Sequence, residues 1–266
     1  MYAFEYARPA DQAAATAAAS SSDDVRYLAG GQSLVQAMKL RLTASEKLVD
    51  LGGIASLKGI QREGDTLVIG ATTAHATVAA SALVQTAIPA LADLAGGIGD
   101  QMVRNMGTIG GSLAHSDPAA CYPSAVLGLG ATIQTDRRTI AGDDFFTGLF
   151  ETALQAGELI VAVHFPVPQR AAYVKYKQPA SRYAMVGVFV SQSAAGVRVA
   201  VTGAKSHVFR ATEIEQALQA SFTPDAAKAV KLSADGINAD LHASAEYRAA
   251  MISVMASRAV AACAAR

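Results

Sequence analysis

Residues 104–120 read RNMGTIGGSLAHSDPAA, and a related stretch, LAGGQSLVQAMKLRL, occupies residues 28–42. Each combines a glycine pair with hydroxyl side chains, Ser33 in the earlier stretch and Thr108 and Ser112 in the later one. Glycine lets a ligand approach the backbone without meeting a Cβ, and successive N–H groups in such turns form a concave site for anionic oxygens. Two such turns on separate loops suit a diphosphate lying between them, so they predict a dinucleotide ligand.

The simpler interpretation is that both stretches are ordinary turns, since glycine pairs most often serve turns. The usual dinucleotide fingerprints are missing, because no G-x-G-x-x-G follows the first strand and no G-x-x-x-x-G-K-[ST] occurs in the chain. A dinucleotide would therefore bind here through a different fold.

The composition is that of a globular protein with a buried core and excludes some classes of partner and metal site. Of 266 residues, 52% are hydrophobic and 17% are charged, which is ample for a buried core, and the net charge of zero argues against a nucleic-acid partner. We expect a cytoplasmic protein, since neither a signal peptide nor a run long enough to span a membrane is present. Only two cysteines occur, Cys121 and Cys263, so a four-cysteine iron–sulfur or zinc site within the chain is excluded by count.

The hydrophobic pattern predicts both helices and strands along the chain. In the first part we expect a small β-α-β unit over residues 1–51, a hairpin over 57–73, one or two helices over 77–99, a helix running into a strand over 121–135, a polar turn over 137–146 and a buried strand over 157–168.

The pattern of residue types changes near residues 168–172, where we expect a domain boundary. Strands follow over residues 171–204, and helices over 210–220 and 245–265. The last helix is expected to turn one face to the core, with the residues Tyr247, Ala250, Met251, Val254 and Ala261.

Four segments occur in an order and spacing that resemble the FAD-binding medium subunit of the molybdenum hydroxylases. They are the two glycine-rich stretches, the segment IGATTAHATV at residues 69–78 and the segment GELIVAVHFPVP at residues 157–168. This is the carbon monoxide dehydrogenase and xanthine dehydrogenase family. The segments YVKYKQPASRYAMVGV and ADLHASAEYRAAMISVMASRAVAA look like the C-terminal domain of the same subunit. The resemblance covers essentially the whole chain.

The resemblance implies an α+β fold, with a vanillyl-alcohol-oxidase (PCMH)-type FAD-binding domain over residues 1–168. This domain has lobes of about 1–55 and 56–168, and a small sheet-and-helix domain follows over 169–266. The resemblance places FAD between the lobes and implies no catalytic residue or metal ligand in this chain. The residues that it implies for cofactor binding are Ala29, Gly30, Gly31, Gln32, Ser33, Leu34, Thr73, Thr108, Ile109, Gly110, Gly111, Ser112, Ile160 and Lys177. Ile109 and Tyr183 are expected near the flavin ring.

The function that the resemblance implies is electron transfer within a heterotrimer. A large subunit with the molybdenum cofactor would oxidise the substrate, and a small subunit with two [2Fe-2S] clusters would pass electrons to the FAD of this chain and on to an external acceptor. A dimer of such heterotrimers is expected. The alternatives are a stand-alone FAD-dependent oxidoreductase and a non-enzymatic assembly subunit that has lost its flavin. The substrate of the complex and the final acceptor stay open at this point.

One departure from the family pattern concerns Cys121, which stands where relatives usually carry an acidic residue that contacts FAD. A thiol is a weak donor and acceptor, so this contact is expected to be lost or replaced. Asp117 lies nearby, and its place before a proline favours a helix N-cap. His115 is interpreted as a neutral packing residue, with a proton shuttle as the alternative. Lys177 is interpreted either as a surface lysine or as a cation beside the flavin.

Overall fold

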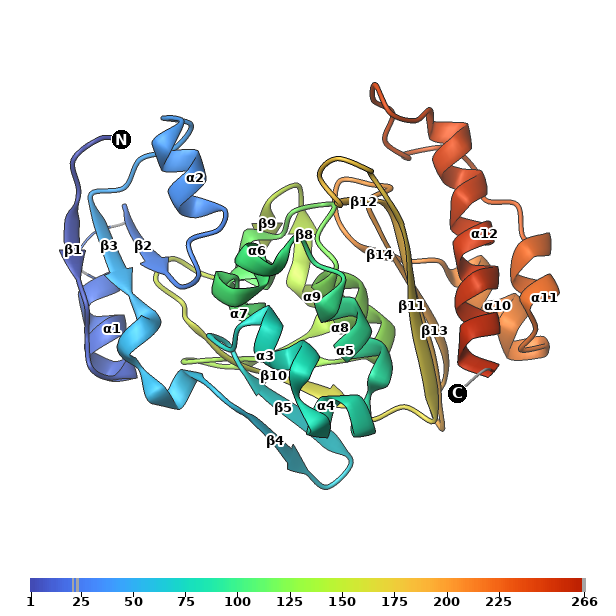
Figure 1. Cartoon of the computed structure of the whole chain (residues 1–266), viewed down its shortest axis with the longest axis horizontal. Helices are drawn as coiled ribbons and strands as arrows, with labels where there is room; N and C mark the ends of the chain where they lie inside the picture. The colour runs from blue at the N-terminus through green and yellow to red at the C-terminus, as the bar shows by residue number, and fades with distance from the viewer. Residues whose placement is uncertain (21, 23, 265–266) are drawn as a thin grey trace.

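The computed structural model describes residues 1–20, 22 and 24–264, and Figure 1 shows three sheets arranged along its length. The N-terminal sheet is parallel, with strand order β1-β3-β2, and the central sheet has the order β4-β5-β10-β6-β7. The C-terminal sheet is antiparallel, with the order β11-β12-β13-β14. The protein is therefore a mixed helix-and-sheet structure, as the sequence predicted.

The N-terminal sheet forms the β-α-β unit expected from the sequence. Alanine-rich α1 connects β1 to β2, and Asp11 caps it by accepting a hydrogen bond from the Ala14 N–H at 2.8 Å. The alanine-rich sequence of residues 10–22 predicts a helix that stops in the serine run, and residue 21 of this run lies outside the described residues. The elements are β1 (Glu5–Ala7), α1 (Gln12–Ala19), β2 (Val25–Leu28), α2 (Leu34–Lys39), β3 (Lys47–Asp50) and two short 3-10 helices, η1 (Leu51–Gly53) and η2 (Ala55–Leu57).

The central sheet has a strand from late in the sequence at its middle. Strand β10 pairs antiparallel with both β5 and β6, and its apolar run leaves Val163 and Phe165 fully buried. The expected hairpin is β4 with β5. The strands are β4 (Ile60–Glu63), β5 (Thr66–Gly70), β6 (Thr132–Thr135), β7 (Thr139–Ala141) and β10 (Ile160–Pro166), with a separate pair β8 (Phe146–Gly148) and β9 (Glu151–Thr152).

Seven helices among the described residues connect the strands of the central sheet. The expectation of one or two helices over residues 77–99 was wrong, because three short ones follow each other there, the third beginning at Pro89. The polar turn expected over 137–146 instead contains β7 and a short helix. The helices are α3 (His75–Ala80), α4 (Ala82–Ala87), α5 (Pro89–Gly96), α6 (Gln101–Met106), α7 (Ile109–His115), α8 (Tyr122–Leu129) and α9 (Gly142–Phe145).

The C-terminal sheet stands between the central helices and the last helix (Figure 1). On the side of the central helices, α8 packs so closely that a Cβ built on Gly128 would lie 2.6 Å from the ring of Phe189. Phe189 therefore belongs to the core of the central part. The elements are β11 (Arg170–Lys177), β12 (Ala184–Ser193), β13 (Gly196–Thr202), β14 (Phe209–Arg210), α10 (Thr212–Ala220), α11 (Pro224–Ala229) and α12 (Ala245–Ala264).

The face of α12 expected to be buried is the wrong one. Ile252, Met255 and Ala259 are fully buried, whereas Tyr247 is 45% exposed. Ala250 and Ala261 are also exposed, and Met251 and Val254 are only partly buried. Alanine occurs on every side of this helix, so the sequence pattern does not single out one face. Residue 265, the end of the expected helix, lies outside the described residues.

No helix in the part of the chain that the structure describes is long and apolar enough to cross a membrane.

Candidate functional site

A cavity of about 540 Å³ lies among the three sheets. Its walls come from β2 and the loop after it, from the loop between α6 and α7, from the segment before β10, and from the turn between β11 and β12. This volume falls within the ordinary range of small-molecule and cofactor sites, roughly 300–1,000 Å³. The cavity therefore brings together segments that lie far apart in the sequence, from β2 to the turn between β11 and β12.

The first glycine loop, residues 29–33, presents free backbone donors to this cavity. Among the described residues, the N–H groups of Gly30, Gly31, Gln32 and Ser33 donate no hydrogen bond. Gly31 adopts φ +69°, a conformation that L side chains rarely take, and its carbonyl accepts from the Val35 N–H at 3.1 Å. Successive N–H groups left unpaired beside a cavity suit anionic oxygens of a ligand.

In the second glycine loop, residues 107–112, most of the backbone N–H groups donate to acceptors within the protein. The N–H of Ile109 donates to the Thr73 carbonyl at 3.2 Å, and the N–H of Gly110 donates to the Ala71 carbonyl at 2.8 Å. The N–H of Gly111 donates to the Thr108 hydroxyl at 3.2 Å, which caps α7. What this loop offers the cavity is therefore mainly its hydroxyl groups, including Ser112, whose side chain forms no hydrogen bond among the described residues.

The two loops touch through glycine. A Cβ built on Gly30 would lie 2.1 Å from the carbonyl oxygen of Met106, the last residue of α6, and 2.8 Å from the Cα of Gly107, where the second loop begins. A Cβ built on Gly110 would lie 2.6 Å from the Cβ of Ala71, which follows β5. These distances are below any real Cβ distance, so both positions require glycine. In Figure 1 the loop that follows β2 accordingly faces α6 and α7.

Most of the residues singled out from the sequence line the cavity, but three do not. The cavity is lined by Ala29, Gly30, Gly31, Gln32, Ser33, Leu34, Thr108, Gly110, Gly111, Ser112 and Ile160. Thr73 is buried behind the cavity wall, where its hydroxyl donates to the Gly59 carbonyl at 3.1 Å. Its neighbour Thr72 lines the cavity instead. Ile109 is fully buried in the core of the central part.

Lys177 is the third residue outside the cavity wall. It lies exposed at the end of β11, where the register with β12 shifts between Tyr176 and Lys177. The lysine that does line the cavity is Lys175, two residues earlier. No sequence signal distinguishes these two lysines, since both fall in the same strand pattern.

Asp117 does not serve as the helix N-cap expected from the sequence. Helix α8 begins five residues later, at Tyr122, and Asp117 instead forms a turn in which its Oδ1 accepts from the Ala119 N–H at 2.8 Å. Asp117 and Cys121 both line the cavity, as does Tyr183, which is 54% exposed. His115 packs its ring against Phe150, with centroids 5.1 Å apart, at the cavity wall.

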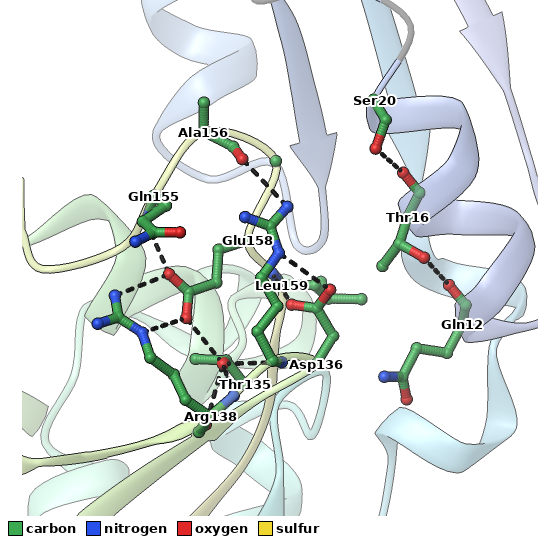
Figure 2. A network of polar contacts seen from close by, with 12 residues as sticks. Gln12, Thr16, Ser20, Thr135, Asp136, Arg138, Gln155, Ala156, Glu158 and Leu159 are labelled. Carbon is green, nitrogen blue, oxygen red and sulfur yellow. Dashed lines mark hydrogen bonds and ion pairs between the residues drawn. The ribbon is translucent and has the colours of Figure 1, made fainter.

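A polar network secures the segment before β10, as Figure 2 shows. Glu158 accepts from the Arg138 Nε at 2.9 Å, the Thr135 hydroxyl at 2.8 Å and the Gln155 N–H at 2.8 Å. Hydrogen bonding to Arg138, above all, lowers the pKa of Glu158 to about 2. The network therefore holds a charged carboxylate, and with it the start of β10 at Ile160, against the cavity.

Two buried polar groups near the cavity have no partner among the described residues. They are Nδ1 of His75 and the hydroxyl of Tyr122, whose rings lie 5.3 Å apart. Burial, assisted by the charge of Arg104, lowers the pKa of His75 to about 4, so this ring is neutral at pH 7. The sequence did not single out His75, which lines the cavity from the first turn of α3.

The donors around the cavity fit a long ligand with anionic oxygens at its middle. Free N–H groups and hydroxyls face it from two loops, and the close contact of Gly30 with Gly107 brings these loops together. FAD, a dinucleotide with a diphosphate between two ring systems, meets this description. The residues present thus fit the cofactor that the sequence resemblance implied.

Comparison with known proteins identifies the family. Residues 2–168 match the family described as the FAD binding domain in molybdopterin dehydrogenase. The nicotine 6-hydroxylase medium subunit of Paenarthrobacter nicotinovorans is 34% identical over 97% of this chain and 96% of its own, and the carbon monoxide dehydrogenase medium chain of Hydrogenophaga pseudoflava is 35% identical over the same shares. The chain therefore belongs to the FAD-binding family of the molybdopterin dehydrogenases.

A solved structure agrees over the whole length. Carbon monoxide dehydrogenase from Hydrogenophaga pseudoflava, in a form that lacks the Mo-pyranopterin moiety of its molybdenum cofactor, matches with a TM-score of 0.90 and 35% identity, covering 99% of this chain and 98% of that chain. The similarity includes the C-terminal sheet and its helices, which lie beyond the family match that ends at residue 168.

Proposed function

We propose that this chain is the FAD-carrying electron-transfer subunit of a heterotrimeric molybdenum hydroxylase. It takes electrons from a [2Fe-2S] cluster of a small subunit and passes them to an external acceptor, while a large subunit with the molybdenum cofactor oxidises the substrate. The observation that carries the proposal is the cavity with free N–H groups at Gly30–Ser33, within a chain of this family.

The finer architecture belongs to the same proposal. We assign a vanillyl-alcohol-oxidase (PCMH)-type domain with lobes of about residues 1–55 and 56–168, and a C-terminal domain of residues 169–266. The division is supported by the change of sheet between β10, which ends at Pro166, and β11, which begins at Arg170. FAD lies between the lobes, under the turn that joins β11 and β12.

Each part of the cavity has a role in holding the cofactor. The N–H groups of the first glycine loop donate to the diphosphate, and the hydroxyls of Thr108 and Ser112 donate from the facing loop. Bound FAD supplies the chemistry of accepting and releasing electrons. The protein orients it, and Ile160 and the turn with Tyr183 limit the access of water to it.

The division of labour between subunits agrees with the cysteine content. The whole sequence has two cysteines, and both are buried at separate places, Cys121 at the cavity and Cys263 on α12, in the core of the C-terminal part. The iron–sulfur clusters of the complex are therefore assigned to the small subunit. We further propose that two heterotrimers associate.

Co-expression with its partner subunits tests this function. The purified complex is expected to contain stoichiometric FAD on this chain, and chemical reduction of the small subunit is expected to bleach the flavin absorbance. Turnover of an organic substrate by the isolated, flavin-loaded chain would instead support a stand-alone oxidoreductase. A complex that assembles without flavin would contradict the proposal.

A further inference from the structure

The side chain of His75, the first residue of α3, lies directly against the start of the second glycine loop. A Cβ built on Gly107 would lie 2.6 Å from the His75 Nε2 and 2.9 Å from its Cδ2, so the ring leaves no room for a side chain at position 107. The main chains are joined at the same place, because the His75 N–H donates to the Gly107 carbonyl at 2.9 Å and Ala74 forms a β-bridge with Thr108. The imidazole therefore supports the loop from the side of α3.

The ring of His75 is itself held by the core. Its centroid lies 5.3 Å from that of Tyr122, which is fully buried on α8, and His75 is only 5% exposed. Neither Nδ1 of His75 nor the Tyr122 hydroxyl has a hydrogen-bond partner among the described residues, so packing fixes this edge of the ring. Burial lowers the pKa of His75, and the ring is neutral at pH 7 and needs no counter-ion where it lies.

Gly107 also contacts the first glycine loop. A Cβ built on Gly30 would lie 2.8 Å from the Gly107 Cα, so the two backbones touch. Gly107 is thus in contact both with the His75 ring and with Gly30. Because protein interiors are close-packed and transmit displacements, the space that the ring occupies affects where Gly107 lies, and with it the separation of the two loops.

We propose that His75 is a positioning residue: through Gly107 its ring sets the separation of the two glycine loops, and thereby the fit of the cofactor's diphosphate between them. The inference rests on the proposed function, since it needs FAD in the cavity. It goes beyond that function by giving a residue outside both glycine loops control over how tightly they hold the ligand.

The test uses the full-length chain, with FAD binding followed by flavin fluorescence and folding by circular dichroism and the thermal midpoint. H75A removes the ring, and H75Q keeps a neutral, planar group of similar reach. V78A is the matched control, because Val78 lies one turn later on α3, is fully buried and does not line the cavity. If H75A does not fold, H75V replaces it, since valine fills part of the space and is shorter than the ring.

H75A and V78A are both expected to lower the thermal midpoint, because both remove buried atoms. Only H75A is expected to weaken FAD binding, by about tenfold, and H75Q is expected to retain most of the wild-type affinity. A stability loss without a loss of affinity is what a merely structural role of His75 would give.

A second pair of variants tests the contact with Gly107. G107A is expected to weaken FAD binding by at least about tenfold, because its methyl group would meet the ring. The double variant H75A/G107A is expected to bind FAD more tightly than G107A, since the methyl group then occupies space that the ring has left. The Val103 carbonyl oxygen, at 3.0 Å, is the next atom that this methyl group would meet.

Several results would overturn the inference. Positions that do not interact multiply their losses of affinity, so losses that multiply in H75A/G107A would contradict the contact. An equal loss of affinity in V78A and H75A, or a folded H75A with unchanged affinity, would overturn the role of His75 while leaving the proposed function intact. A wild-type chain that binds no FAD would overturn the proposed function as well.

Discussion

Gly30 of the first glycine loop lies directly against the carbonyl of Met106, the last residue of α6 before the second glycine loop, so closely that a Cβ on Gly30 would come within 2.1 Å of that oxygen. The atom that this Cβ would meet belongs to the backbone, which cannot change its rotamer to make room as a side chain can. The spacing of the two loops across the cavity is thus set at a position where only glycine fits.

The variant G30A is therefore expected to push the loops apart. We expect a cost of about 1–3 kcal/mol in the free energy of unfolding, as for other overpacked sites, and a loss of FAD affinity of at least about tenfold. Denaturant titration and fluorescence titration with FAD measure the two effects. In the control G96A, the new Cβ would meet only the Ala79 Cβ at 3.8 Å, so both quantities should stay close to wild type. Equal behaviour of G30A and G96A would contradict the contact.

Two hydroxyls of the second glycine loop are expected to separate stability from binding. Thr108 caps α7 through the Gly111 N–H, so T108V should cost about 1 kcal/mol of stability and also weaken FAD binding. The Ser112 hydroxyl has no partner among the described residues but lines the cavity, so S112A should weaken FAD binding and leave the unfolding free energy unchanged. A stability loss in S112A equal to that in T108V would refute this assignment.

The carboxylate of Glu158 predicts an acid-sensitive contribution to stability. Its pKa in the folded protein is about 2, against an ordinary value of 4.5, so its contribution is fully present above pH 4.5 and is lost as the pH falls toward 2. E158Q should be less stable than wild type by about 1.5–3 kcal/mol at pH 7, the range for a hydrogen bond to a charged group. The difference should shrink below pH 4.5. A difference that is constant from pH 7 to pH 3 would show that charge is not its cause.

His75 predicts a second pH effect in a separate range. Its pKa is lowered from 6.5 to about 4, so the unfolded chain takes up a proton between these values and the folded chain does not. Stability is therefore expected to fall as the pH drops from 6.5 to 4. The variant H75Q should lose this slope and keep the Glu158 effect at lower pH. If the slope persists in H75Q, another group causes it.

The sequence predicted the parts of the fold whose signals are local. The apolar run of β10, the Asp11-capped α1 and the hairpin of β4 and β5 have patterns that a single period or turn explains. The buried face of α12 was not predictable, since alanines around the helix leave no contrast, and Ile252 and Met255 become core only through the sheet they contact. The three helices between His75 and Gly96 are too short to display a clear period.

In the candidate site, too, only the features with local sequence signals were predictable. Both glycine loops were found from glycines and hydroxyls, because these residue types restrict what a turn can do. Which N–H groups are free was not predictable, since the Gly110 N–H donates to the carbonyl of Ala71, which follows β5 and is distant in the sequence. The place of Lys175 rather than Lys177 at the cavity depends on where the β11–β12 register shifts, which leaves no mark in the sequence.

Amide hydrogen exchange at the first glycine loop, with and without FAD, tests the central claim most directly. Because the N–H groups of Gly30–Ser33 donate to nothing among the described residues, they are expected to exchange quickly in the free chain and to become strongly protected when FAD binds. Stoichiometric FAD binding that leaves these amides exchanging as before would contradict the placement of the diphosphate at this loop.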